Sequence, residues 1–137
     1  MAVPTYGLTH AAIAVRDLQR AADFYRAVFG AVVVYESDGP PGEGNFVQLQ
    51  TPGSRDVLVF EEDGKRAGKR GGVVHLGFRL VDPKDIDAAA AAVEAAGGKV
   101  TDKGEFCPGE PYLFCHDPDG YEVEIWYELP TAVDPPA

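Results

Sequence analysis

The sequence lacks several features that mark specialised classes of protein. Its 137 residues include two cysteines, no run approaching about 18 consecutive apolar residues, and no basic segment followed by an apolar one at the N-terminus. These absences exclude a fold that depends on disulfides and predict neither a membrane-spanning helix nor a secretory signal. We therefore expect a cytoplasmic protein in which both thiols, Cys107 and Cys115, are reduced.

Positive charge is also scarce. Lysine and arginine total 12 against 22 acidic residues, so the formal charge is −10 at pH 7, and the basic residues are scattered along the chain. Binding to a phosphate backbone needs clustered positive charge, so nucleic acid is an unfavourable partner and a small molecule is the expected one. Hydrophobic residues make up 45% of the chain, which fits one globular domain over residues 1–137.

The chain contains an internal duplication. Gly7–Asp17 aligns with Gly72–Asp82, and the glycine, histidine and aspartate of the first segment recur in the second at one constant spacing. Phe46–Phe60 aligns with Tyr112–Trp126 at a spacing that is longer by a single residue. The charged, glycine-rich segment 63–71 separates the copies and is typical of an exposed linker. The sequence therefore predicts two modules of similar structure.

Each module is expected to form a strand, a helix and three more strands. Asp17 and Asp82 stand at helix N-cap positions, and apolar residues recur at helical spacing after both. The modules are expected at 7–62 and 72–128, with strands at 8–15, 31–36, 45–50 and 56–61 in the first, and at 73–81, 99–103, 111–116 and 121–127 in the second. The predicted class is α+β, with two tandem βαβββ modules forming a curved mixed sheet, a pair of half-barrels, around a metal or ligand cup.

Three polar side chains can converge in such a cup. Strand residues alternate between faces, so His10 and His75 lie opposite the apolar residues of their strands, and Glu124 lies on the polar face of the last strand. A single histidine on a strand is more often structural, but two at equivalent positions of a duplication favour metal ligation. Two imidazoles and one carboxylate form a facial triad for a divalent metal, with open positions for water or substrate.

On these residues the chain resembles a known family. The parts that carry the resemblance are the His10 strand with the following Val15–Tyr25, the His75 strand, and Phe114–Glu124. Over residues 7–128 the chain is similar to the vicinal oxygen chelate superfamily, which includes glyoxalase I, extradiol dioxygenases, methylmalonyl-CoA epimerase, fosfomycin resistance enzymes and bleomycin resistance proteins. The resemblance implies paired βαβββ modules, metal ligation by His10, His75 and Glu124, and a homodimer.

The longer of the two repeat spacings sets Leu58 opposite Glu124, at the position where glyoxalase I carries a carboxylate ligand. Leucine cannot bind a metal, so the resemblance implies a three-ligand site with Leu58 as an apolar wall, and Glu61 could serve only after a register shift. Phe114 replaces the tyrosine of the extradiol pattern, and Ala12 replaces the threonine of fosfomycin enzymes.

Other polar and aromatic residues are candidates for the site. His116 is expected either to carry protons, beside Glu124 as the second catalytic candidate, or to be structural. Arg79 could bind a carboxylate or phosphate of the substrate, or pair with a neighbouring acid. The expected pocket wall consists of Gln48, Tyr112, Phe114, Trp126 and Leu58, with packing as the alternative role for the aromatic rings.

The sequence thus predicts a metal-dependent vicinal oxygen chelate enzyme for a small oxygen-chelating substrate. Its reaction is either of the dioxygenase type or that of a glyoxalase-like lyase or isomerase. The expected cofactor is a divalent metal ion, with Fe(II) favoured over Mn, Zn and Ni. The alternative is a metal-free protein that sequesters a drug or metabolite, as bleomycin resistance proteins do.

Overall fold

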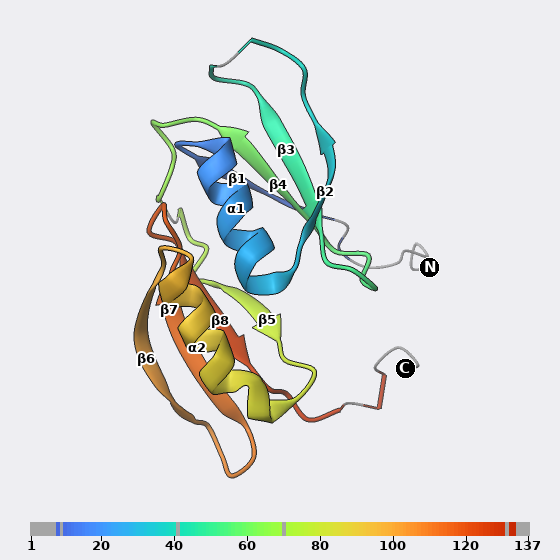
Figure 1. Cartoon of the computed structure of the whole chain (residues 1–137), viewed down its shortest axis with the longest axis vertical. Coiled ribbons are helices and arrows are strands. Elements are labelled where there is room, and N and C mark those ends of the chain that lie inside the picture. The colour runs from blue at the N-terminus through green and yellow to red at the C-terminus, as the bar shows by residue number, and fades with distance from the viewer. Residues whose placement is uncertain (1–7, 9, 41, 70, 131, 134–137) are drawn as a thin grey trace. The chain divides into compact units, whose positions relative to one another are not determined.

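A computed structural model describes the chain at residues 8, 10–40, 42–69, 71–130, 132 and 133. It forms two compact units, Met1–Lys69 with Pro118–Gly120, and Arg70–Asp117 with Tyr121–Ala137. Each has a four-stranded sheet and its own helix (Figure 1), so the predicted α+β class and the two tandem βαβββ modules are confirmed. The boundary falls in the predicted linker. Gly7, the expected start of the first module, and Arg70 in the linker lie outside the described residues.

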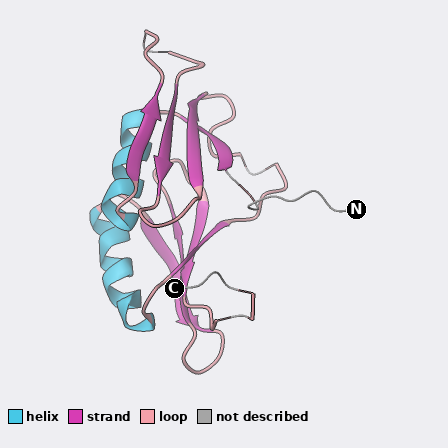
Figure 2. Cartoon of the chain, turned by 90° about the vertical axis from the view of Figure 1, so that its right-hand side faces the viewer, coloured by secondary structure: helices cyan, strands magenta, loops and turns pink. Residues whose placement is uncertain are grey.

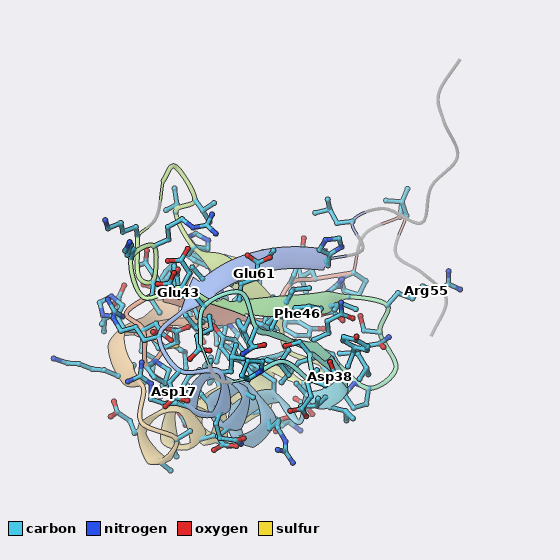
Figure 3. All side chains as sticks on the ribbon, turned by 90° about the horizontal axis from the view of Figure 1, so that it is seen from above. Asp17, Asp38, Glu43, Phe46, Arg55 and Glu61 are labelled. Carbon is cyan, nitrogen blue, oxygen red and sulfur yellow. The ribbon has the colours of Figure 1, made fainter. Side chains whose placement is uncertain are left out.

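The first unit follows the expected order of one strand, one helix and three strands. Its elements are β1 (His10–Val15), α1 (Leu18–Phe29), β2 (Val32–Glu36), β3 (Phe46–Gln50) and β4 (Val57–Glu62). The sheet order is β1-β4-β3-β2, with β1 parallel to β4 and the other pairs antiparallel. Asp17 lies where β1 gives way to α1 (Figure 3), and its side chain accepts a hydrogen bond from the Arg20 amide at 2.9 Å. Gly30 ends α1 with a left-handed φ of 66°.

Helix α1 covers one face of this sheet (Figure 2). Phe60 on β4 and Leu49 on β3 lie on the covered face, and the Tyr25 ring of α1 lies 5.0 Å from that of Phe60. All three residues are at most 1% exposed, and burial of each large apolar side chain stabilises the fold by roughly 1.5–3 kcal/mol. Because strand residues alternate, the polar residues between them lie on the face that α1 leaves open.

The second unit repeats this pattern with the sheet order β5-β8-β7-β6. Its elements are β5 (Leu76–Arg79), a 3₁₀ turn η1 (Pro83–Asp85), α2 (Ile86–Ala95), β6 (Lys99–Glu105), β7 (Pro111–His116) and β8 (Glu122–Trp126). The expected strand at 73–81 is too long. Val73 and Val74 are 59% and 63% exposed and belong to no strand, so His75 comes directly before β5.

The second unit buries its apolar residues between α2 and one face of the sheet. Val93 of α2 and Leu113, Cys115 and Val123 of the sheet are fully buried. Burial, with smaller effects of Asp117 and Glu94, raises the pKa of the Cys115 thiol to about 12, so that it stays protonated. Cys107 is exposed, and both thiols are free, as expected. No helix within the described residues is long and apolar enough to cross a membrane.

The turn Pro118–Gly120 is bound to the residues that lead into α1. The Asp119 side chain is fully buried and accepts hydrogen bonds from the Arg16 amide at 3.0 Å, from Arg16 Nη1 at 3.3 Å and from Arg20 Nη2 at 3.1 Å. Arg16 Nη2 also donates to the Ala67 carbonyl at 3.1 Å. Ala67 is only 3% exposed, so the segment expected to be an exposed linker is partly packed.

Replacing Asp119 by alanine should lower the free energy of unfolding by about 2–4 kcal/mol, measured by urea denaturation. The substitution removes the carboxylate that accepts from the part-buried Arg16 amide and from both guanidinium groups. Both arginines are about half exposed, and Arg16 keeps its bond to the Ala67 carbonyl, which reduces the loss. Asp23→Ala is the matched control, because Asp23 contacts Arg26 on the surface at 3.9 Å. Its effect should stay within about 0.5 kcal/mol. Equal losses of unfolding free energy in both variants would show that the buried contacts of Asp119 stabilise the fold no more than a surface ion pair does.

Candidate functional site

His75 and Glu124 lie together on the open face of the second sheet. His75 Nε2 is 3.0 Å from Glu124 Oε2, and Glu124 is only 8% exposed. The parallel pairing of β5 with β8 sets Gly77 opposite Glu124, and His75 comes two residues before Gly77. A Cβ atom on Gly77 would lie 4.0 Å from Glu124 Oε2, so glycine keeps space open beside the carboxylate.

Phe114 lies on the other side of Glu124. The two residues are paired in the antiparallel ladder of β7 and β8, so their side chains share a face. The His75 ring meets the Phe114 ring edge to face, with centroids 5.4 Å apart. The carboxylate is therefore flanked by an imidazole and an aromatic ring, where little water surrounds it and its interaction with a cation is stronger than in bulk solvent.

His116 and Glu122 occupy the next pair along the same two strands. They are directly opposite each other in the ladder, on the face that carries Phe114 and Glu124. His116 is half-buried. The structure thus brings His116, which is predicted either to carry protons or to be structural, to the same face as the His75–Glu124 pair.

Aromatic rings continue along this face in the opposite direction. Tyr112 and Trp126 are paired in the ladder, and Phe106, which follows β6, stacks on Tyr112 with centroids 4.1 Å apart and planes 15° apart. Phe106 also meets Trp126 edge to face at 5.9 Å, and Tyr112 meets Phe114 at 5.6 Å. We call Phe106, Tyr112, Phe114 and Trp126 the aromatic row.

Strand β6 supports the aromatic row at Tyr112. The Tyr112 hydroxyl donates to Asp102 Oδ2 at 3.1 Å, and this hydrogen bond is the main reason that the pKa of Tyr112 is raised. Tyr112 therefore remains a proton donor at neutral pH. Gly104 is paired with Tyr112, and a Cβ atom there would lie 3.1–3.3 Å from the tyrosine ring, which is closer than most real contacts.

Arg79 lies at the Trp126 end of the same face. It is paired with Trp126 in the β5–β8 ladder, and its Nη2 donates to the Glu128 carbonyl at 3.2 Å. The guanidinium is exposed and engages the main chain after β8. Its expected role as an anion-binding group stays a prediction.

In the first unit, the open face carries His10 and Gln48. His10 begins β1 and is exposed, and one row across this sheet consists of Ala12, Val59 and Gln48. Leu58 is instead paired with Leu49, which is 1% exposed and belongs to the core beneath α1. The expected place of Leu58 on the open face, as an apolar wall of the metal site, is therefore wrong.

The reason is a difference in turn length. Six residues, 51–56, connect β3 to β4, whereas five residues, 117–121, connect β7 to β8. The extra residue lies in the turn, so β4 aligns with β8 at the shorter of the two repeat spacings, and Val59 is the counterpart of Glu124. Glu61 is paired with Ala14 (Figure 3 labels Glu61), so it shares the His10 face without any register shift.

The predicted metal ligands are brought together only in part. His75 and Glu124 form a pair in the second unit, and His10 belongs to the first unit. Among the residues that the structure describes, no group of three histidine, cysteine or acidic side chains could hold a metal. The pair itself fits a divalent metal, because an imidazole nitrogen and a buried carboxylate oxygen are suitable ligands that already point at one another.

Two residues of the site have no clear signal in the sequence. Asp102 lies opposite Phe114 because a bulge follows Val100 in β6, so alternation counted from the start of the strand assigns it to the wrong face. Phe106 lies beyond the strand, where periodicity gives no direction. Only its high exposure of 53%, seen in the structure, distinguishes it.

Comparisons with known proteins agree with this architecture. The family model of the Glyoxalase/Bleomycin resistance protein/Dioxygenase superfamily matches residues 7–125. An ethylmalonyl-CoA/methylmalonyl-CoA epimerase of Cereibacter sphaeroides is 33% identical over 130 residues, which cover 86% of this chain and 95% of the relative. A lactoylglutathione lyase of Haemophilus influenzae is 30% identical over 126 residues, which cover 86% and 90%.

Solved structures share the fold at lower identity. A fosfomycin resistance protein, FosX, from Listeria monocytogenes, in complex with Mn(II) and a dihydroxypropylphosphonic acid, superimposes with a TM-score of 0.72. The two sequences are 17% identical, and the match covers 89% of this chain and 90% of that one.

Proposed function

The chain belongs to the Glyoxalase/Bleomycin resistance protein/Dioxygenase superfamily, and from that premise we propose that it is a metal-dependent enzyme whose small substrate binds through two neighbouring oxygen atoms. The observation that carries this proposal is the His75–Glu124 pair on the open face of the second sheet. The pair supplies two ligands of the proposed metal site. His10, which holds the equivalent position in the first repeat, stays the predicted third ligand.

The names of the two relatives favour proton transfer as the reaction, hence an isomerase or lyase rather than a dioxygenase. A bound divalent ion supplies Lewis acidity that stabilises negative charge on the substrate oxygens. His116 takes up and returns the proton, because its half-buried imidazole shares the Glu124 face. Tyr112 does not act as the base, because its hydroxyl donates its only proton to Asp102, which raises the pKa of Tyr112.

A metal-free binding protein is the second candidate. His75 and Glu124 lie 3.0 Å apart, so each is a hydrogen-bonding partner for the other without an ion between them. The net charge of −10 also suits a cationic ligand. Measurement of metal binding separates the two candidates.

Purified protein should bind about one divalent ion per chain, and His75→Ala and Glu124→Gln should lose it. Each variant removes a ligand from a three-ligand set, which we expect to weaken binding at least about 100-fold. Elemental analysis after reconstitution with Fe(II), Mn(II), Zn(II) or Ni(II) measures the content. Glu122→Gln is the matched control, since Glu122 lies on the same strand and face, and it should keep the metal. A wild-type protein that takes up no ion would favour the metal-free binding protein.

Val59→Glu should tighten metal binding by about tenfold or more. Val59 is the counterpart of Glu124, so a carboxylate there adds an anionic oxygen on the His10 face. Because wild type lacks the carboxylate that glyoxalase I carries at this position, it should isomerise the hemithioacetal of methylglyoxal and glutathione poorly. Competition with a chelator measures affinity. Leu58→Glu is the control, because its carboxylate lies on the opposite face from His10 and should leave the metal affinity unchanged. Unchanged affinity in Val59→Glu would place the metal away from Val59.

The protein should be a homodimer. Each four-stranded sheet has edge strands and an open face, and pairing of chains is the usual way for small domains to cover such surfaces. Light scattering at micromolar concentration should give about twice the chain mass of 14.6 kDa. A monomer mass at that concentration would contradict this expectation.

A further inference from the structure

We propose that the substrate carries a planar, uncharged aromatic group, which stacks on the aromatic row while its two oxygens face His75 and Glu124. This inference rests on the proposed function and specifies the substrate class of the same site. It is drawn from the position, exposure and electrostatic surroundings of the four rings.

The row begins at the proposed metal ligands and leads away from them. Phe114 contacts the His75 ring and is paired with Glu124, and Tyr112 lies two residues earlier on the same strand and face. Two residues of a strand span about 6.6 Å, which is the scale of one phenyl ring. An aromatic group attached next to a chelating oxygen pair would therefore reach Tyr112 and Phe106 without a long spacer.

Phe106, at the end of the row away from Glu124, is exposed to solvent although it stacks on Tyr112. Phe106 lies 53% exposed over Tyr112, and the rings of Tyr112, Phe114 and Trp126 are half-buried. Water in contact with contiguous aromatic surface is unfavourable, and such surfaces mark binding sites for apolar partners. The mutual stacking fixes the rings in place, so little conformational entropy is lost when another ring covers them.

The acidic side chains beside the aromatic row disfavour anionic substituents there. Asp102 is bonded to the Tyr112 hydroxyl, and Glu122 lies on the same face two residues from Glu124. The cations of that face are Arg79, which donates to the Glu128 carbonyl, and Lys99, which is paired with His116 at the other end of the face. A polyanionic carrier such as coenzyme A would meet acidic groups here, whereas a neutral ring meets apolar surface and the hydroxyl of Tyr112.

Two chelating probes test the proposal on Mn(II)-loaded full-length protein. Acetohydroxamic acid and benzohydroxamic acid present the same oxygen pair and differ in a methyl against a phenyl group. Calorimetry gives both dissociation constants, and Trp126, the single tryptophan, reports ring contact by its fluorescence. The measured quantity is the ratio of the two affinities, compared between wild type and Phe106→Ala, so that the intrinsic preference of the metal cancels.

In wild type the phenyl probe should bind more tightly and change the Trp126 emission. In Phe106→Ala the ratio should fall by about three- to tenfold, the loss of one stacking contact, while the affinity for acetohydroxamic acid stays constant. A carboxyl group at the para position of the phenyl probe should weaken binding. Phe29→Leu is the matched control, because Phe29 stacks on Tyr25 at 5.8 Å in α1, on the covered side of the first sheet, and its ratio should equal that of wild type.

Three outcomes would overturn the proposal. If acetohydroxamic acid fails to bind the metal-loaded protein, the proposed chelating function is wrong, and this inference falls with it. If acetohydroxamic acid binds and the ratio is the same in Phe106→Ala, the inference alone is wrong. If Phe106→Ala halves the mass measured by light scattering, the aromatic row is covered by a second copy of the chain rather than by substrate.

Discussion

The parallel pairing of β5 with β8 is the constraint on which the candidate site depends. These strands are far apart in the sequence, and their register alone decides that Gly77 faces Glu124, with His75 two residues earlier. Because side chains alternate, a shift by one residue would send Glu124 into the core beneath α2 and bring Val123 to the open face. The fully buried Val123 and Leu113 oppose such a shift, since each would lose its apolar surroundings. The packing of the core thus holds the polar pair in place from the other side of the sheet.

The two units show how one backbone pattern supports two different surfaces. Equivalent rows across the sheets contain Ala12, Val59 and Gln48 in the first unit, and Gly77, Glu124 and Phe114 in the second. The first row has no ionisable side chain, whereas the second has a buried carboxylate beside an aromatic ring. The histidine that precedes each row is the feature they share. The second unit therefore carries a buried carboxylate and an aromatic surface, whereas the open face of the first unit carries His10 and the amide of Gln48.

Much of the fold is readable from the sequence because it depends on local and periodic signals. The N-cap at Asp17, the helical spacing of apolar residues and the duplicated histidines predict the modules correctly. The site is predicted less well. Alignment by spacing assigns Leu58 to the open face, because comparing two similar strands does not reveal an extra residue in the turn before one of them. The hydrogen-bonded register of β3 and β4 shows that Leu58 lies on the covered face. The face on which Asp102 lies depends on a bulge in β6, and His75 lies before β5 rather than within it. Both features depend on how the strands pair in the folded chain.

The first module is completed by a turn that the second repeat encodes. The first compact unit includes Pro118–Gly120, and Arg16 and Arg20 find their carboxylate there, on Asp119. A polypeptide ending at Lys69 would keep the strands and helix of the first module and lack this acceptor. The two halves of the duplication are therefore not equivalent. The first half expressed alone would need a carboxylate from another segment or from a second polypeptide to accept the hydrogen bonds of Arg16 and Arg20 at the start of α1.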